Sequence, residues 1–517
     1  MVSIDSPTKR ILLLSAYDAA SHQHWRQQLV TMFPHCHWTH LVLPARYFSW
    51  RIRGNSLSWA FNHRQKLTDN YDLLIATSVC DLASLRGFVP ELARVPTLVY
   101  FHENQLAYPD SGKQHPSVEP AMVNLYSALC ADQVAFNSEW NQRSFLEGVR
   151  ALLRRLPDEV PPELVSLLTA KSLVLPVPLA DGLFVGSELC SAAQADLAVV
   201  RTRRVSVPGG SRRPSLGSDG SPLPQGLPAP LTLHSDDKCA PSQTNGMHQE
   251  HDSASGQRGF RLADSSNVDG SGTGRDVGLE GDAADRRSPW MGDASPHGGV
   301  YGVSAASPSN PAALNPHNSH SQPAAPKPIS IVWNHRHEHD KGPERLLLVI
   351  QALIKHNQRF QLHLLGQRFR QRPAAFDQLE QILADYYQAQ GIEPGINRFI
   401  EERQQYEAIL RSADMVLSTA DHDFQGLSML EAAALGCMAI APAALAYPEY
   451  LPAEGLYPVE GLSLGQQADA AAGLIVRHAQ YQAQHPGQRT VPQSVLALKA
   501  TNLASRWQHC LQSLAKS

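Results

Sequence analysis

The sequence has few cysteines and no long apolar runs, and these absences exclude several classes of protein. Its seven cysteines are scattered over 517 residues, and no two of them lie at metal-ligand spacing. Such a set is typical of reduced core cysteines, not of a disulfide framework or a zinc site. No stretch reaches the roughly 20 apolar residues of a membrane span, and the first apolar run is too short for a signal peptide. We therefore expect a cytoplasmic protein that does not enter a membrane.

The chain also lacks an excess of charge of either sign. Its formal net charge is -4, and charged residues make up 18% of the sequence against 43% for hydrophobic residues. A nearly neutral chain does not coat nucleic acid non-specifically, so a nucleic-acid partner would require a local basic patch. The apolar content is sufficient for two separate cores in a chain of this length.

Aromatic residues almost vanish between residues 186 and 327. Only Phe260, Trp290 and Tyr301 remain there, among runs of Gly, Pro, Ser and Asp. A segment of this composition cannot bury enough apolar surface to offset about 1–2 kcal/mol of backbone entropy per residue. We expect a long disordered insertion that carries no chemistry.

This interpretation of the insertion predicts the behaviour of a deletion variant. Removing residues 190–325 and joining the ends with a short flexible linker is expected to preserve folding and most activity, because surface loops tolerate changes in length. The measurements are the thermal melting temperature and the activity of the variant. A collapse of the melting temperature would mean that the segment packs against the rest of the chain.

Short apolar runs alternate with helical patterns on both sides of the insertion. Strands are expected at 11–17, 72–78, 97–102, 133–138 and 172–178, and again at 329–334, 360–366, 415–419 and 437–442. Continuous apolar strands separated by helices indicate parallel sheets with helices on both faces. We predict an α/β fold with two doubly wound, Rossmann-like domains facing a cleft, at 9–185 and 328–490. A final helical stretch, 491–517, is expected to cross back to the first domain. Ligands of such sheets bind at the carboxyl ends of the strands.

Two cations follow the first strand of the second domain. Arg336 and Lys341 are expected in a strand-to-helix loop, where a guanidinium fork and an ammonium group can bind one pyrophosphate without a metal. Taken alone, the pair is also compatible with a solvated, charged loop. His335, His337 and His339 alternate in the same loop, but the two cations would repel a metal ion. We predict no metal site.

A second candidate anion site follows the expected strand at 415–419. Gly426 permits a tight turn, and the N–H groups of Leu427 and Ser428 at the start of a helix would then face an anion. Glu431 lies one turn into that helix, where its carboxylate can accept hydrogen bonds from a ribose diol. The alternative is an amphipathic helix that carries one exposed Glu. Both elements together favour a site for a nucleotide-sugar donor.

These residues give the second half a resemblance to the retaining GT-B glycosyltransferases. In that family two acidic residues with seven residues between them follow an Arg–Lys pair, as Asp423 and Glu431 follow Arg336 and Lys341 here. Asp423 stands where the family has Glu. The resemblance implies that Asp423 lies near the transferred sugar as a catalytic residue and that Glu431 binds the ribose.

Motifs in the first half narrow the resemblance. The runs YDAASH (17–22), WRIR (50–53), YFHENQ (100–105) and FNS (136–138) occur in this order before HRHEHDK (335–341). Together they resemble the tRNA-queuosine α-mannosyltransferase family, and the likeness covers both patterned halves. It implies transfer of mannose from GDP-mannose to queuosine-containing tRNA with retention, with no cofactor and no obligate protein partner.

The same resemblance suggests roles for residues of the first half. His102, at the end of an expected strand, would assist the reacting centre, and Glu103 would act as a general base or orient His102. A core histidine bonded to the backbone is the alternative for His102. The residues expected to contact the acceptor are Ser21, His22, Trp50, Arg51, Arg53 and Asn104. Trp50 would stack on a splayed base, and the arginines would bind phosphates.

Two other functions remain open on the sequence. One is a GT-B mannosyl- or glucosyltransferase that acts on a lipid, a glycan or a small metabolite. The other is a catalytically inert RNA-binding module on the same scaffold. An inert module has no need of Arg336, Lys341 and Glu431, and no basic-aromatic amphipathic helix indicates a lipid substrate.

Overall fold

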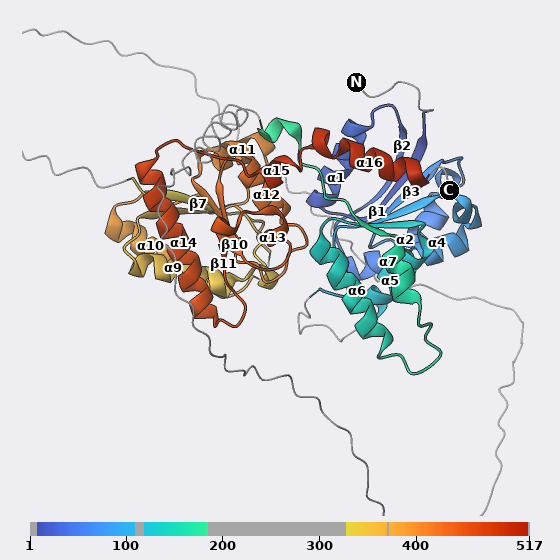
Figure 1. The fold of residues 1–517 in the computed structure, drawn as a ribbon, viewed down its shortest axis with the longest axis horizontal. Coiled ribbons are helices and arrows are strands. Elements are labelled where there is room, and N and C mark those ends of the chain that lie inside the picture. Colours follow the sequence, from blue (N-terminus) through green and yellow to red (C-terminus); the bar gives the residue numbers. More distant parts are fainter. Residues whose placement is uncertain (1–7, 109–117, 185–326, 370–371, 515–517) are drawn as a thin grey trace, which may run out of the picture. The chain divides into compact units, whose positions relative to one another are not determined.

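The computed structural model describes residues 8–108, 118–184, 327–369 and 372–514. These residues form two parallel β-sheets that are covered by helices (Figure 1). The predicted α/β class with two parallel sheets is therefore confirmed. The insertion predicted at 186–327 lies, except for its last residue, outside the described residues.

The first sheet contains six strands in the order β2-β1-β3-β4-β5-β6. Neighbouring strands pair in parallel throughout. The strands are β1 (Arg10–Asp18), β2 (His37–Pro44), β3 (Leu73–Thr77), β4 (Thr97–Phe101), β5 (Gln133–Phe136) and β6 (Ser172–Val174). Every residue of β3 and β4 is buried, because helices cover both faces of the sheet.

Helices connect these strands and supply the cover. They are α1 (Ala20–Met32), α2 (Phe48–Asn62), α3 (Arg64–Leu67), α4 (Leu82–Phe88), α5 (Glu119–Cys130), α6 (Glu139–Leu153) and α7 (Leu164–Ala170), with short 3-10 helices at Pro90–Arg94 and Asp181–Phe184. Side chains of Asp81 and Ser138 cap α4 and α6 by accepting hydrogen bonds from backbone N–H groups.

The second sheet contains five strands in the order β11-β10-β9-β7-β8. They are β7 (Ile329–Trp333), β8 (Phe360–Leu364), β9 (Met415–Leu417), β10 (Met438–Pro442) and β11 (Leu456–Tyr457). The helices around them are α9 (Pro343–Lys355), α10 (Ala375–Gln390), α11 (Arg403–Ser412), α12 (Leu427–Ala434), α13 (Tyr447–Tyr450) and α14 (Leu464–Gln484), with 3-10 turns at His339–Lys341 and Ala453–Gly455. Strands β9 and β7 bring the two loops of the candidate donor site next to each other.

The last helices contact the first sheet. After α15 (Gln493–Leu496), Lys499 forms an isolated parallel bridge with Leu179. Within α16 (Ala500–Leu514), Arg506 donates a hydrogen bond to the carbonyl of Val174 at 2.8 Å, and Trp507 is fully buried. Helix α16 thereby covers part of the first sheet with residues from the far end of the chain.

All nine strands expected from the sequence are present, but β2 and β11 were missed. Strand β2 lies at an edge of its sheet, and only Leu41 in it is fully buried. An edge strand of this kind carries His, Trp and Thr in place of a continuous apolar run, so it lacks the pattern that identified the others. Within the described ranges, no helix is long and apolar enough to cross a membrane.

Candidate active site

Two strand-to-helix loops of the second sheet are fixed to each other by backbone contacts that only glycine permits. Gly342 has a φ of 61°, and a Cβ atom there would lie 1.9 Å from the carbonyl oxygen of Thr419. The Thr419 hydroxyl donates to the Lys341 carbonyl at 2.9 Å and accepts from the Trp333 indole at 3.0 Å. The loop after β7 and the loop after β9 therefore form one unit.

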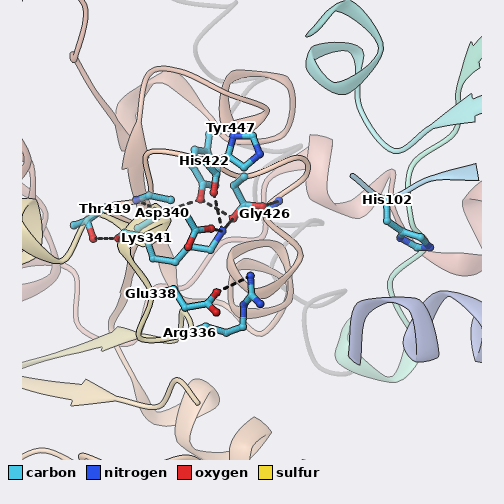
Figure 2. Close-up of polar contacts among 12 residues, drawn as sticks. His102, Arg336, Glu338, Asp340, Lys341, Thr419, His422, Gly426 and Tyr447 are labelled. Atoms are coloured by element: carbon cyan, nitrogen blue, oxygen red, sulfur yellow. Dashed lines mark hydrogen bonds and ion pairs between the residues drawn. The ribbon is translucent and has the colours of Figure 1, made fainter. Parts of the chain in front are cut away.

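Lys341 lies at the centre of this unit, where its ammonium group is largely buried (Figure 2). Its Nζ donates to the carbonyl of His422 at 2.7 Å and lies 3.2 Å from Asp340 and 3.9 Å from Asp423. Two carboxylates and one carbonyl thus hold the buried ammonium in place. A cation held in this way acts as a fixed point charge.

Asp423 is held by the chain on both of its carboxylate oxygens. Oδ1 accepts from the Gly426 N–H at 2.9 Å, and Oδ2 accepts from the Tyr447 hydroxyl at 3.0 Å. Burial by itself would raise the pKa of this carboxyl, but Lys341 and these hydrogen bonds outweigh burial and hold the pKa below its usual value. The residue predicted beside the transferred sugar is therefore ionised and shapes its own loop.

The predicted turn at the start of α12 is present. Gly426 precedes the helix with a φ of 75°, and a Cβ atom there would lie 2.6 Å from the Tyr447 ring. Leu427 and Ser428 follow as the first helical residues, whose N–H groups have no acceptor within the helix. N–H groups in this arrangement are able to bind an anion.

Arg336 and Lys341, predicted as one pyrophosphate clamp, lie in different environments. The Arg336 side chain is almost half exposed, and its guanidinium forms an ion pair with Glu338 at 3.0 Å (Figure 2). Lys341 is buried and bound to groups of its own loop. Of the two cations, Arg336 thus has the more exposed side chain.

Glu431, predicted to bind ribose, is bound by an arginine that the sequence analysis missed. Arg403, at the start of α11, places Nη2 2.9 Å from Oε1 and Nη1 3.2 Å from Oε2 of this buried carboxylate. The same guanidinium lies 5.6 Å from the centre of the Tyr406 ring. Because Arg403 precedes Glu431 by 28 residues on another helix, no local pattern links the two.

Residues His102 and His22 form a buried pair at the carboxyl end of β4. Their ring centroids are 4.0 Å apart in an edge-on arrangement, and the rings of Trp25 and Tyr100 pack against His102. Burial lowers the pKa of His102 well below its usual value and that of His22 to about 4, so both rings are neutral. Among the described residues, Nε2 of His102 has no hydrogen-bond partner, although the atom itself is buried.

His22 lies against the His102 ring and is itself buried. It was predicted to contact the acceptor, but its side chain is 3% exposed, and neither ring nitrogen bonds to any described residue. Ser21, beside it in the first turn of α1, is partly buried. His22 therefore contributes to the site through His102, and direct contact with a large acceptor would require the surrounding side chains to move.

Asn104 also differs from its predicted role. Its side chain is fully buried, with Nδ2 donating to Asn141 at 2.8 Å and to Ser144 at 3.1 Å, and Oδ1 accepting from the Ala107 N–H at 2.9 Å. Asn104 therefore holds the turn after β4. Burial raises the pKa of the adjacent Glu103, which favours its protonated form.

The remaining predicted acceptor residues lie on α2. Trp50 is exposed, Arg51 donates from Nε to the carbonyl of Pro44 at 3.3 Å, and Arg53 forms an ion pair with Glu119. All three lie on α2, whereas His22 lies on α1 and His102 follows β4. Within the described part of the chain, no group of three or more His, Cys, Asp or Glu side chains is placed to hold a metal ion.

The two halves of the chain match two different protein families. Residues 10–179 match the family described as tRNA-queuosine alpha-mannosyltransferase N-terminal, and residues 328–477 match glycosyl transferases group 1. A similar protein, the tRNA-queuosine alpha-mannosyltransferase of Drosophila melanogaster, is 25% identical over 449 residues, covering 86% of this chain and 83% of the fly protein.

Solved structures of similar fold cover nearly the whole chain. Sucrose-phosphate synthase from Thermosynechococcus elongatus superposes with a TM-score of 0.51 at 14% identity, covering 98% of this chain and 100% of that one. The N-terminal domain of Candida albicans trehalose-6-phosphate phosphatase also reaches 0.51, at 11% identity, covering 99% and 98%. At such low identity these likenesses show the fold alone, and they confirm the predicted GT-B arrangement.

Proposed function

We propose that this chain, which belongs to the tRNA-queuosine alpha-mannosyltransferase family, transfers mannose from GDP-mannose to queuosine in tRNA with retention of configuration. The chain is a glycosyltransferase by its group 1 domain. The observation that carries the proposal is the match of residues 10–179 to a family defined by this acceptor, joined to that domain. The proposal includes no cofactor besides the donor, and it places the reaction in the cytoplasm.

The donor diphosphate would bind at the two loops of the second sheet. The N–H groups at the start of α12 would bind one phosphate. Arg336 would leave Glu338 and bind the other phosphate, and the positive charge of Lys341 would stabilise both. Glu431 would hydrogen-bond the ribose once it shares or releases Arg403. Fixed cations and N–H groups stabilise the charge that grows on the diphosphate as the sugar leaves.

Sugar transfer breaks the bond between the sugar C1 and the β-phosphate oxygen and forms a bond from C1 to an acceptor hydroxyl oxygen. The hydroxyl proton passes to the leaving phosphate oxygen on the same face of the sugar, which accounts for retention without a protein nucleophile. His102, neutral and with Nε2 unpartnered within the described residues, would hydrogen-bond a sugar hydroxyl near this centre. The products are GDP and the glycosylated nucleoside.

The direct test is incubation of the purified protein with GDP-mannose and queuosine-containing tRNA, followed by mass spectrometry of the nucleosides. A hexosylated queuosine is expected, and none should form from tRNA that lacks queuosine. Parallel reactions with GDP-glucose and UDP-glucose identify the donor. If queuosine stays unmodified with every donor while the protein binds GDP, the proposed acceptor is wrong.

A further inference from the structure

Helix α2 is apolar on two opposite faces. Its inner face packs Ile52 and Trp59 into the core of the first sheet. Its outer face exposes a row of large apolar side chains at spacings of three, seven and four residues, which places them on one side of the helix. This row, the α2 stripe, consists of Tyr47, Trp50, Leu57 and Phe61.

The exposure of the α2 stripe is large for side chains of this kind. Tyr47 is 72% exposed, Phe61 71% and Trp50 50%. Phe88 of α4 extends the row, because its ring contacts that of Phe61 edge-on at 5.9 Å. Isolated apolar residues on a surface are ordinary, but a contiguous row marks an interaction site.

Local geometry holds the first two aromatic rings at the surface. Tyr47 precedes α2 with a φ of 55°, a left-handed conformation that is rare for an aromatic residue. The ring of Trp50 lies on Gly54, where a Cβ atom would come within 2.6 Å of it. Glycine at this position therefore lets the indole lie along the helix, and half of the side chain remains open to solvent.

Positive charge surrounds the α2 stripe. From residue 19 to residue 68 the chain contains no Asp or Glu but has six cations, in a protein of net charge -4: Arg26, Arg46, Arg51, Arg53, Arg64 and Lys66. The guanidinium of Arg46 lies 5.7 Å from the Tyr47 ring centre. Three of the six are neutralised by ion pairs, Arg26 with Asp18, Arg53 with Glu119 and Arg64 with Glu91, whereas Arg46, Arg51 and Lys66 form no ion pair with any residue described. The surface therefore complements a polyanion that offers flat aromatic groups.

The position of α2 relates this surface to the reaction centre. Because α2 follows β2 in a parallel sheet, it begins at the carboxyl edge, where β4 ends beside His102, and runs toward the opposite edge (Figure 1). A helix of 15 residues spans about 22 Å. The α2 stripe thus leads away from the edge where the reacting nucleotide would bind.

We propose that the α2 stripe binds unpaired nucleotides of the acceptor RNA outside the reacting nucleotide, by stacking of bases on its rings and pairing of phosphates with the flanking arginines. The inference rests on the proposed function, since that function supplies an RNA acceptor. Aromatic rings interleaved with arginines are the means by which proteins bind unpaired RNA. The charge pattern favours RNA over a protein partner, which would need a matching acidic apolar face.

Variants at the far end of the α2 stripe test the proposal without altering residues assigned to the reaction. The protein with Leu57→Ser and Phe61→Ser is expected to bind both tRNA and a short oligouridine RNA about tenfold more weakly. GDP binding and the melting temperature should stay at the parent values. Fluorescence anisotropy with each labelled RNA measures the affinities, and calorimetry with GDP measures the donor site. The matched control is Tyr481→Ser, which removes a half-exposed aromatic ring from α14 and should change none of these values.

Gly54→Ala offers a complementary variant that removes no aromatic or charged group. The added methyl group would displace the Trp50 ring, whose far end is able to move. Because alanine favours a helix interior over glycine, the fold should not weaken. RNA affinity is expected to fall severalfold, and an unchanged affinity would mean that the position of the Trp50 ring has no part in binding.

The outcomes separate this inference from the proposed function. If the parent binds neither RNA, the RNA acceptor itself is wrong. If the parent glycosylates and binds tRNA, and the Leu57→Ser, Phe61→Ser variant binds it equally well, only the α2 stripe is excluded as the RNA surface. If that variant instead loses self-association in sedimentation while its RNA affinity is unchanged, the stripe is an interface between copies, which also overturns the proposal.

The arginines beside the α2 stripe should carry the salt dependence of binding. Arg51→Ala combined with Arg53→Ala is expected to weaken tRNA binding and to lower the slope of log affinity against log salt by about one to two units, because fewer counterions are released. GDP affinity should remain unchanged. Measuring tRNA affinity at two salt concentrations decides the matter, and equal slopes for variant and parent would place the phosphate contacts elsewhere.

Discussion

Lys341→Met is expected to reduce the rate of sugar transfer by about tenfold to a hundredfold or more, since a hydrogen bond to a charged group contributes about 1.5–3 kcal/mol. Methionine keeps the length and apolar character of the lysine side chain but removes the buried ammonium. The developing diphosphate charge then loses its fixed cation. Steady-state kinetics with a saturating acceptor and calorimetry with GDP measure the loss.

The same substitution is expected to destabilise the protein, and a second variant separates the two effects. Asp340 and Asp423 would remain buried without their shared cation, and breaking a buried ion pair typically costs about 3–5 kcal/mol. Adding Asp340→Asn to Lys341→Met should recover part of the stability, because it removes one of the two unpaired charges, but should not recover the rate.

Lys355→Met is the matched control, because this exposed lysine ends the helix that follows the loop of Lys341. It should leave both rate and stability unchanged. Near-parent kinetics and GDP affinity in a folded Lys341→Met protein would remove this residue from the donor site.

Acidification from pH 6.5 to about 4 is expected to remove a large part of the free energy of unfolding. Burial lowers the pKa of His22, His335, His337 and His422 to about 4 in the folded protein. In the unfolded chain their pKa is near 6.5. Between these values the unfolded state binds more protons, so stability is fully present above pH 6.5 and falls as the pH drops toward 4.

The size of this effect follows from the number of groups. Each unit of pKa difference corresponds to about 1.4 kcal/mol, and typical domains have only about 5–15 kcal/mol of stability in total. Two or three such histidines therefore suffice to unfold the protein in mild acid. Urea unfolding at pH 7, 6 and 5 measures the change.

His337→Phe tests one histidine of the set. The His337 ring stacks on Phe376 with centroids 4.1 Å apart, and within the described residues neither ring nitrogen has a hydrogen-bond partner. Phenylalanine should preserve the stacking and reduce the dependence of stability on pH by one proton. An unchanged pH dependence would mean that His337 does not titrate in this window.

Local signals predicted the turn before α12. Gly426 lies between a strand and a helix, where the sequence analysis placed a tight turn, and Gly342 permits a similar close approach in the loop after β7. Arg336 and Lys341 were inferred from the chemistry of a diphosphate ligand. Tyr447 and Arg403 escaped prediction because each meets its carboxylate from a different helix, 24 and 28 residues away in the chain.

The first half shows why motif membership does not specify a role. Asn104 and His22 belong to the runs that carry the family resemblance, yet both side chains are buried. Whether a side chain is buried depends on which elements pack over it. Asn104, for example, is covered by α6, and the spacing of residues within its motif does not predict that contact. The exposed Trp50, in contrast, keeps the accessibility that its prediction required.

The contact of α16 with the first sheet has a consequence for the order of folding during synthesis. Trp507 packs 5.4 Å from Tyr100 and 6.1 Å from Trp25, measured between ring centroids, and all three rings are buried. Until residues 500–514 have left the ribosome, this aromatic surface has no cover, although the strands beneath it were made hundreds of residues earlier. The first domain therefore completes its packing only after α16 has been synthesised. Until then the nascent chain exposes an apolar surface to which a chaperone can bind.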